Sequence, residues 1–433
     1  MERYALNLKK RNFFSEKYAT VPSRWRFGVK NRSFVRFSPG KGVPKTIFCP
    51  WWPRLLHNLG LILSYLYFGG SWLLDVRGDP IGGDFSHYWV AASLALKAGP
   101  AAVYDPDRLL AAQKEFFGIR VPLIWLYPPT FLMLLLPLGL LPYLLALALW
   151  LSLPLAALVL VVRRIAPSHL SPWLALAFPG AFMNLLHGQN GLLSASLLGA
   201  GLLLLERAPV SAGVLLGLLS YKPQLAVLIP VALAAGRRWR ALVSMGISAA
   251  ALIAASLLVL GTGAWAAFFH NLPGTLAILE TGRLGKGVVL VTAKMPTWAA
   301  AVLLAGGPPW LAQLLQAGVM LATTGIVFWV WSRQAAPAVL VLCALLFPPY
   351  EFIYDLAILA LPLAWLAWEG HVEGWRPGEQ ALLVLAFLTP LLMPILAGTI
   401  RLQIAPLVLT ALLAMALRRL RPPARLTPNK MSF

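Results

Sequence analysis

Long apolar runs separated by short polar segments repeat along most of the chain. The first run covers Leu55–Leu74. Further runs begin near residues 142, 171, 191, 209, 222, 240, 310, 336, 355, 381 and 399. A run of about 20 apolar residues forms a helix long enough to cross a hydrocarbon core of about 30 Å. Because the runs are rich in Leu and Ala and lack the two-residue period of barrel strands, the pattern predicts an all-α polytopic membrane protein with about twelve transmembrane helices.

The composition agrees with this class of protein. Hydrophobic residues make up 59% of the 433 residues and charged residues 12%, with a mean hydropathy of +0.74. Soluble domains average about 45–50% apolar and about 25% charged residues, so a soluble enzyme, a disordered chain and a fibrous repeat are excluded. Cys49 and Cys343 set no disulfide framework, and no Cys/His cluster has metal-ligand spacing. We therefore expect neither a metal nor another cofactor.

The net charge of +21 is concentrated at the two ends of the chain. Residues 1–54 contain thirteen Lys or Arg and two Glu, and residues 418–433 contain five basic residues. Basic tails on a membrane protein are typical of cytoplasmic segments beside anionic lipid, which argues against nucleic-acid binding. We expect a flexible cytoplasmic tail (1–54) without the layout of a cleavable signal peptide, a membrane domain (55–417) and a basic cytoplasmic C-terminal tail (418–433).

The internal basic residues indicate which loops face the cytoplasm. With both tails cytoplasmic the number of spans is even, and twelve spans keep all the basic clusters inside. These clusters are Arg163–Arg164, Arg207, Arg237–Arg240, Arg333 and Arg376. Two proline-containing apolar stretches, 123–141 and 288–305, then lie outside as re-entrant or interfacial helices. If both span the membrane instead, the count rises to fourteen.

The twelve-span threading brings the unusual polar segments to the outer face. They are residues 75–122 with Asp75, Asp79 and Asp84, the turn His187–Asn190, the hairpin Tyr221–Gln224, the loop 261–309 and the segment Pro348–Asp355. Polar residues within or beside membrane segments are costly and by default indicate a site. We therefore expect the working site on the extracytoplasmic side.

Asp84 is the most informative acid of the first outer loop. A carboxylate held over a membrane cavity can take a proton from a sugar hydroxyl within hydrogen-bond distance. The alternative is that Asp84 caps the helix that follows it, because Asp is a favoured N-cap residue. His87 lies three residues later, on the same helix face. It is expected to orient the base or bind the acceptor, with an ordinary exposed histidine as the alternative.

Several short motifs occur in an order that resembles a known family. They are Asp84-Phe85-x-x-Tyr88, Ala98-Gly99, Tyr104-Asp105, Tyr127-Pro128-Pro129, Pro137-Leu138, Leu141-Pro142, Gly188-Gln189-Asn190, Gly213 and Gly217 before Lys222-Pro223-Gln224, and Arg237-Arg238-Trp239. By these motifs the chain resembles the bacterial polyprenyl-phosphate-mannose-dependent mannosyltransferases of glycosyltransferase family 87. That family belongs to the GT-C superfamily of membrane glycosyltransferases.

The resemblance implies a GT-C fold with a large first extracytoplasmic loop that carries surface helices. It also implies that Asp84 is the catalytic base of an inverting displacement, in which an acceptor hydroxyl attacks C1 of a sugar held by a lipid monophosphate. The implied partners are a polyprenyl-phosphate-mannose donor, a glycolipid or glycan acceptor and membrane lipid. The implied location is the bacterial inner membrane, with the active site facing the periplasm.

The leaving phosphate of such a donor needs positive charge or hydrogen-bond donors. Lys222 is expected to supply them from the outer end of its hairpin, and the alternative is a lysine that snorkels to lipid headgroups. Arg283 and Lys286 lie in a glycine-rich outer loop whose backbone can approach an anion closely. The alternative for this loop is a solvated flexible segment.

Further polar and aromatic residues on the outer face are expected to bind the sugar or the acceptor. They are His87, Tyr88, Tyr127, Gln189, Asn190, Gln224, Glu351 and Tyr354. Ordinary turn chemistry is the alternative for Gln189 and Asn190. Glu351 and Asp355, spaced i and i+4, are compatible with a metal or a second base, or with one sugar ligand and one helix cap. One branch of the family has a histidine-bearing segment here, so the acceptor of this chain stays open.

A transporter or flippase for a lipid-linked saccharide is the main alternative function. Secondary transporters usually contain internal repeats with paired broken helices, and the sequence has no matching halves. An O-antigen ligase or polymerase typically carries its large loop late in the chain, whereas this chain has it first. The absence of a glycine-rich phosphate loop and of an Asp-x-Asp motif argues against a nucleotide-sugar donor.

Overall fold

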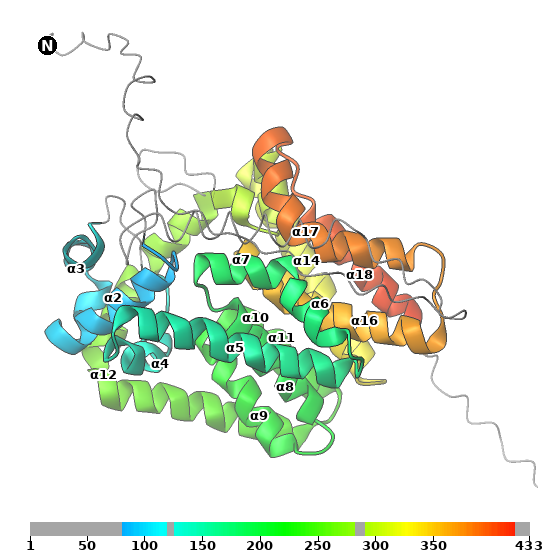
Figure 1. Ribbon diagram of the computed structural model, residues 1–433, viewed down its shortest axis with the longest axis horizontal. Coiled ribbons are helices and arrows are strands. Elements are labelled where there is room, and N and C mark those ends of the chain that lie inside the picture. The colour runs from blue at the N-terminus through cyan, green and yellow to red at the C-terminus, as the bar shows by residue number, and fades with distance from the viewer. Residues whose placement is uncertain (1–79, 119–124, 282–290, 421–433) are drawn as a thin grey trace, which may run out of the picture. The chain divides into compact units, whose positions relative to one another are not determined.

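The computed structural model describes residues 80–118, 125–281 and 291–420, and every regular element within these ranges is a helix (Figure 1). The all-α prediction is therefore confirmed for this part of the chain. The predicted first span Leu55–Leu74 and the N-terminal tail lie outside the described residues. Most of the predicted C-terminal tail does too, although the last described helix extends two residues past the expected boundary at 417, to Arg419.

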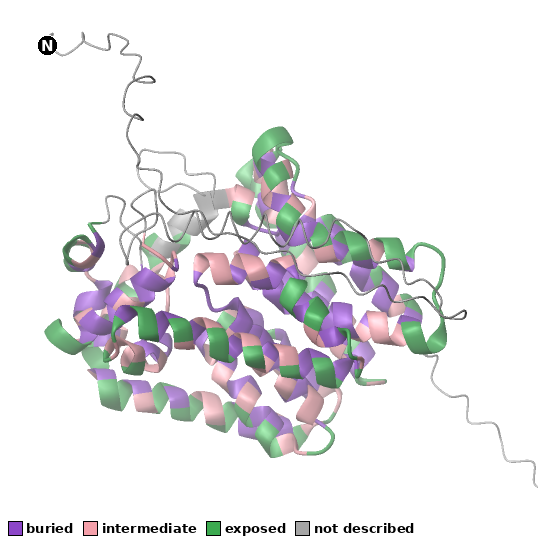
Figure 2. Cartoon of the chain, viewed as in Figure 1, coloured by how far each residue is buried: buried purple, intermediate pink, exposed green. Residues whose placement is uncertain are grey.

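Among the residues that the structure describes, five helical segments are long and apolar enough to cross a membrane, which makes the chain an integral membrane protein. They are α5 (Tyr143–Ile165), α12 (Trp239–Thr281, apolar over Trp239–Gly274), α14 (Pro309–Trp331), the continuous segment of η4 (Ile353–Leu359) and α16 (Ala360–Glu373), and α17 (Glu379–Ile400). The count of twelve spans stays a prediction. In the η4–α16 segment 72% of the most apolar stretch is buried, against 22% in α12. Figure 2 shows this contrast, because exposed residues recur along α12.

The other elements are shorter. They are α2 (Phe85–Ala98), η1 (Pro100–Tyr104), α3 (Pro106–Phe117), α4 (Pro129–Gly139), α6 (Ser171–Ala177), α7 (Pro179–His187), α8 (Gly191–Leu204), α9 (Pro209–Leu218), η2 (Leu219–Tyr221), α10 (Pro223–Ala226), α11 (Leu228–Ala235), η3 (Val291–Lys294), α13 (Trp298–Leu304), α15 (Pro337–Leu346) and α18 (Ala405–Arg419). The helices expected in the first loop are present as α2, η1 and α3, but α2 is largely buried and is not the surface helix that was expected.

Proline marks where many of these helices begin. A proline at the first helical position loses no intrahelical hydrogen bond and has a helical φ already. All the predicted helix starts that fall on described residues agree with the structure within two residues, except the last, where 399 was expected and α18 begins at Ala405. That run begins later because α17 continues to Ile400.

The two proline-containing apolar stretches, 123–141 and 288–305, contain short helices. In 123–141 the only described helix is α4, which has 11 residues, and the described part of 288–305 contains η3 and α13. At a rise of about 1.5 Å per residue, α4 is roughly 16 Å long, half of a hydrocarbon core. Their re-entrant or interfacial placement remains a prediction.

One expected span is interrupted, and another ends near its expected boundary but is followed by further helix. Phe178 adopts an extended conformation before Pro179 and separates α6 from α7, as expected for a residue that precedes proline. The span that begins near 240 was expected to end where the outer loop 261–309 begins, and Gly261 breaks the helix there with a φ of +77°. The chain then continues as helix to Thr281, so two helices meet end to end at Gly261. A residue with a side chain would be strained at this φ, whereas glycine adopts it readily.

The packing of these helices brings distant segments together. α8 lies between α5 and α9, and α9 packs along α12 (Figure 1). η4 packs against both α7 and α8, and α2 packs against α4. The turn between α7 and α8, the start of α2 and the start of η4 consequently meet in one region.

Candidate functional site

The turn between α7 and α8 holds the start of α2 in place. Gly188 ends α7 in the left-handed conformation, with a φ of +63°. A Cβ atom on this residue would lie 1.9 Å from the carbonyl oxygen of Gly82. The backbone N–H of Asp84 donates to the carbonyl of His187 at 2.8 Å. Gly188 is therefore required both by its φ and by the close approach of the segment that carries Asp84.

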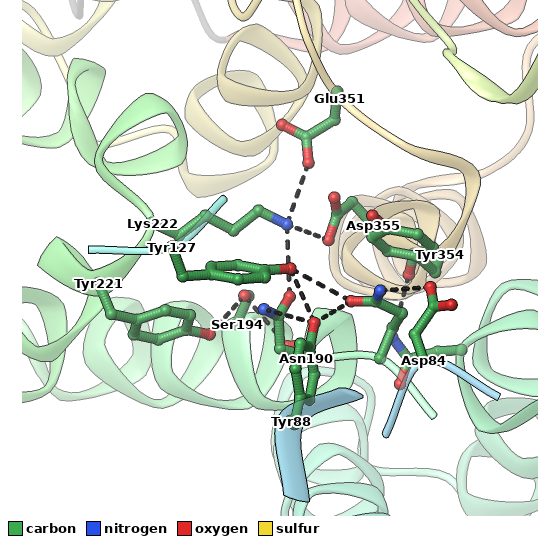
Figure 3. Close-up of polar contacts among 12 residues, drawn as sticks. Asp84, Tyr88, Tyr127, Asn190, Ser194, Tyr221, Lys222, Glu351, Tyr354 and Asp355 are labelled. Carbon is green, nitrogen blue, oxygen red and sulfur yellow. Dashed lines mark hydrogen bonds and ion pairs between the residues drawn. The ribbon is translucent and has the colours of Figure 1, made fainter. Parts of the chain in front are cut away.

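Asp84 does not use its carboxylate as a helix cap. It occupies the N-cap position of α2, but its side chain makes no capping hydrogen bond. Instead Oδ2 accepts a hydrogen bond of 2.6 Å from Nε2 of Gln189 (Figure 3). The side chain is half-buried. The capping alternative is thus wrong, and the carboxylate faces a polar cluster instead.

Two tyrosines and two amides continue this cluster. The hydroxyl of Tyr88 donates to Oε1 of Gln189 and lies 2.7 Å from the hydroxyl of Tyr127. Tyr127 also lies 3.3 Å from Gln189 Oε1, and Nδ2 of Asn190 donates to the Tyr88 hydroxyl at 3.5 Å. Tyr88, Gln189 and Asn190 are buried. The structure therefore joins these four predicted residues to Asp84 in one network (Figure 3).

Lys222 lies at the break between η2 and α10 and is 3% exposed. Its Nζ pairs with the carboxylates of Asp355 and Glu351, the latter at 3.4 Å, and donates to Oδ1 of Asn190 at 3.4 Å. Of these three contacts the one to Asn190 is a hydrogen bond, whereas the two acids are ion pairs whose carboxylate oxygens accept no hydrogen bond among the described residues (Figure 3). The amine is enclosed by protein, so the snorkelling alternative is wrong. Its predicted phosphate role stays a prediction.

The charges around Lys222 shift each other's ionisation. Burial alone lowers the pKa of Lys222, but the Asp355 and Glu351 carboxylates outweigh it and raise this pKa above its ordinary value. Burial, reinforced by the Asp355 carboxylate, raises the pKa of Glu351 well above its ordinary value. The lysine therefore stays protonated, and Glu351 takes up a proton more readily than an exposed glutamate. Neither acid caps a helix through its side chain in the way the sequence suggested for one of them.

Three residues of this region were not among the predicted site residues, although the sequence had singled out Asp355 for its spacing from Glu351. Asp355 is the closest partner of Lys222. Ser194 and Tyr221 are buried and share a hydrogen bond of 2.7 Å between their hydroxyls. The available signal for Asp355 was its i, i+4 spacing from Glu351 in an apolar segment. For Ser194 and Tyr221 the sequence offered no comparable signal.

The remaining predicted residues lie at the edge of the network or outside it. Tyr354 places its ring 5.8 Å from Lys222 Nζ. His87 is 5% exposed, so the exposed-histidine alternative is wrong. Its Nδ1 lies 2.8 Å from Nε2 of Gln113. Gln224 is half-buried and has no hydrogen bond to another described residue. Arg283 and Lys286 lie outside the described residues.

No group of three or more His, Cys, Asp or Glu side chains is placed to hold a metal ion among the residues that the structure describes. The residues nearest to such a set are Glu351 and Asp355, and a lysine occupies the position between them. The cluster therefore combines one half-buried carboxylate, hydroxyl and amide groups, and a buried lysine between two acids.

The fold and the site define an integral membrane protein with a polar site built between its helices. The model of glycosyltransferase family 87 matches residues 125–349, just over half of the chain, and the chain belongs to this family. No curated protein and no solved structure matches the chain. The matched region contains Tyr127, Gln189, Asn190 and Lys222, while Asp84 precedes it. The protein is thus a membrane glycosyltransferase, an enzyme with a sugar donor and an acceptor.

Proposed function

We propose that this enzyme transfers a sugar, mannose in the first instance, from a polyprenyl-phosphate donor to a lipid-linked or glycan acceptor on the extracytoplasmic side. Family membership supports sugar transfer. The apolar helices around the site support a donor and an acceptor that reach it from the membrane. A lipid-phosphate donor can present its sugar on the outer side, where nucleotide sugars are absent. No cofactor enters the proposal.

The proposed reaction is a single inverting displacement with Asp84 as general base. The acceptor hydroxyl gives its proton to the Asp84 carboxylate while its oxygen forms a bond to C1 of the sugar. The bond between C1 and the phosphate oxygen breaks, and the polyprenyl phosphate leaves with the electron pair. A β-linked mannosyl donor would give an α-linked product.

The observation that carries the proposal is that the Asp84 carboxylate neither caps its helix nor pairs with a cation among the described residues, and accepts a hydrogen bond from Gln189. The Asp84 side chain is half-buried. An acid in this position stands beside hydroxyl and amide groups of the kind that bind sugars, such as Tyr127 and Asn190. These two side chains, with Tyr88 and Tyr354, remain our candidates for contact with the sugar or the acceptor.

Positive charge at the leaving phosphate is proposed to come from Lys222, with Arg283 and Lys286. Because the Lys222 ammonium is enclosed by Asp355, Glu351 and Asn190, a donor phosphate would have to displace one of these three groups to reach it. We assign this displacement to Glu351. Its raised pKa means that it takes up a proton readily, and a neutral Glu351 does not compete with the negative phosphate for Lys222. The phosphate role of Lys222 and the base role of Asp84 are independent, so an experiment can refute the first and leave the second intact.

The test is transfer of labelled mannose from polyprenyl-phosphate-mannose by the purified full-length protein, with membrane extracts supplying acceptors. Asp84→Asn is expected to retain donor binding and to lose about 10²- to 10⁴-fold in turnover. Asp107→Asn is the matched control, because Asp107 is an exposed acid of the same loop. Equal turnover of Asp84→Asn and wild type would remove Asp84 from the mechanism. Lipid movement across liposomes without any transfer would favour the transporter alternative.

A further inference from the structure

Resting on the proposed function, we propose that Gln189 is a positioning residue for the base. Its amide fixes one oxygen of the Asp84 carboxylate and leaves the other oxygen to take the proton from the acceptor hydroxyl. The sequence placed Gln189 among the groups that bind sugar hydroxyls. The contacts of its side chain point to a different role.

The orientation of the Gln189 amide follows from its partners. An ionised carboxylate only accepts hydrogen bonds, so the amide NH₂ must face Asp84, where Nε2 lies 2.6 Å from Oδ2. The amide oxygen then faces the two phenols and accepts from Tyr88, with the Tyr127 hydroxyl at 3.3 Å. A glutamine side chain that is 6% exposed and engaged at both ends has little capacity left for a sugar hydroxyl.

Asp84 is held at two points by the same turn. Its backbone N–H donates to His187, and its carboxylate accepts from Gln189, two residues further along. Two anchors on one rigid turn restrict both the backbone and the side-chain torsion of Asp84. The position of a reacting group matters steeply, because a displacement of about 1 Å can reduce the rate by about 10²-fold.

The dependence of the transfer rate on pH distinguishes a positioning role of Gln189 from a role in binding the sugar. Tyr88 on α2 and Tyr354 on η4 also interact electrostatically with Asp84. A phenol has an ordinary pKa of about 10, so both groups stay neutral while the acid limb of the profile is measured. His187 on the same turn has its Nδ1 2.8 Å from the carbonyl oxygen of Met183 and is present in every variant. A difference in the acid limb between a variant and the wild type therefore reports the Asp84 carboxylate and residue 189.

The experiment uses the purified full-length protein with labelled polyprenyl-phosphate-mannose and compares Gln189→Glu, Gln189→Met and wild type. Gln189→Glu places a second carboxylate beside Asp84, so the acid limb is expected to move to higher pH by about one unit or more. Gln189→Met keeps the volume but loses the hydrogen bond, so kcat is expected to fall about 10- to 100-fold while donor KM changes little. Gln403→Met is the control: its buried amide donates to the carbonyl of Met295 at 2.8 Å and to none of the residues of the cluster around Asp84.

Donor binding and thermal unfolding of each variant show whether it has folded. A pH profile of Gln189→Glu that overlies the wild-type profile, together with a raised KM in Gln189→Met, would overturn the positioning role and favour sugar binding. Absence of transfer by the wild type would instead refute the proposed function, and the inference with it. The two failures are distinguished by whether the wild type is active.

Discussion

Replacing Lys222 with methionine tests the buried charge cluster most directly. The change leaves Glu351 and Asp355, whose side chains are 0% and 1% exposed, without their shared cation. At 3.4 Å and an effective dielectric constant of about 20, the gross attraction between Lys222 and Glu351 is about 5 kcal/mol. Desolvation offsets part of this gain, and removal of one partner of a buried pair typically costs about 3–5 kcal/mol. We expect Lys222→Met to lower the free energy of unfolding by that amount.

The assay is reversible unfolding of the purified protein in detergent or in a bilayer mimic. The matched control is Arg238→Met, which breaks the ion pair of Arg238 with Glu206, whose side chains are 36% and 62% exposed. An exposed pair contributes about 0–1 kcal/mol, so this control should unfold nearly as the wild type does. Adding Glu351→Gln and Asp355→Asn to Lys222→Met removes the uncompensated charges, and we expect much of the lost stability to return.

The comparison refutes the reasoning if Lys222→Met and Arg238→Met lose equal, small amounts of stability. In that case the two acids would not depend on the lysine, and water or a proton would have to compensate them. Recovery in the triple variant also separates charge from packing. If the loss came from the shape of the lysine side chain alone, the additional substitutions would not restore stability.

Three further changes test local features of the fold. Gly188→Ala is expected to destabilise the protein or prevent its folding, because the new Cβ would lie 1.9 Å from the Gly82 carbonyl oxygen at a positive φ; yield and thermal unfolding report this. Ser194→Ala leaves the buried Tyr221 hydroxyl without its 2.7 Å partner and should cost about 1–3 kcal/mol in unfolding free energy. Asp105→Ala removes the N-cap of α3, whose carboxylate accepts from two backbone N–H groups, and should cost about 1 kcal/mol, measurable as faster amide hydrogen exchange in that helix.

The sequence predicted where helices begin better than how far they extend. Proline residues such as Pro223 and Pro337 stand at the first helical position, so a start is a local property of the chain. Breaks inside a helix are harder to predict, because the residues before and after the break are equally apolar. The break before Pro179 is an example: it separates α6 from α7, whereas Pro154 lies inside the continuous helix α5.

The candidate site was predicted as a set of residue types, whereas its pairings required the fold. Asp84, Gln189 and Lys222 stood out because polar groups are rare in such an apolar chain. Which oxygen meets which nitrogen depends on contacts between α2, the α7–α8 turn and η4, which lie far apart in the sequence. For this reason the sequence could not show that Gln189 serves Asp84, or that Asp355 serves Lys222.

The separation of Lys222 from its acids along the chain has a consequence for biosynthesis. Lys222 stands between two apolar helices, and its counter-charges at Glu351 and Asp355 are translated about 130 residues later. Synthesis proceeds at about 5–20 residues per second, so Lys222 is made roughly 6 to 26 s before the two acids. Asn190 is already synthesised by then and is the first of the three partners that Lys222 can meet. Until Glu351 and Asp355 have been synthesised, the amide oxygen of Asn190 is thus the one of its three final partners that the Lys222 ammonium can bind.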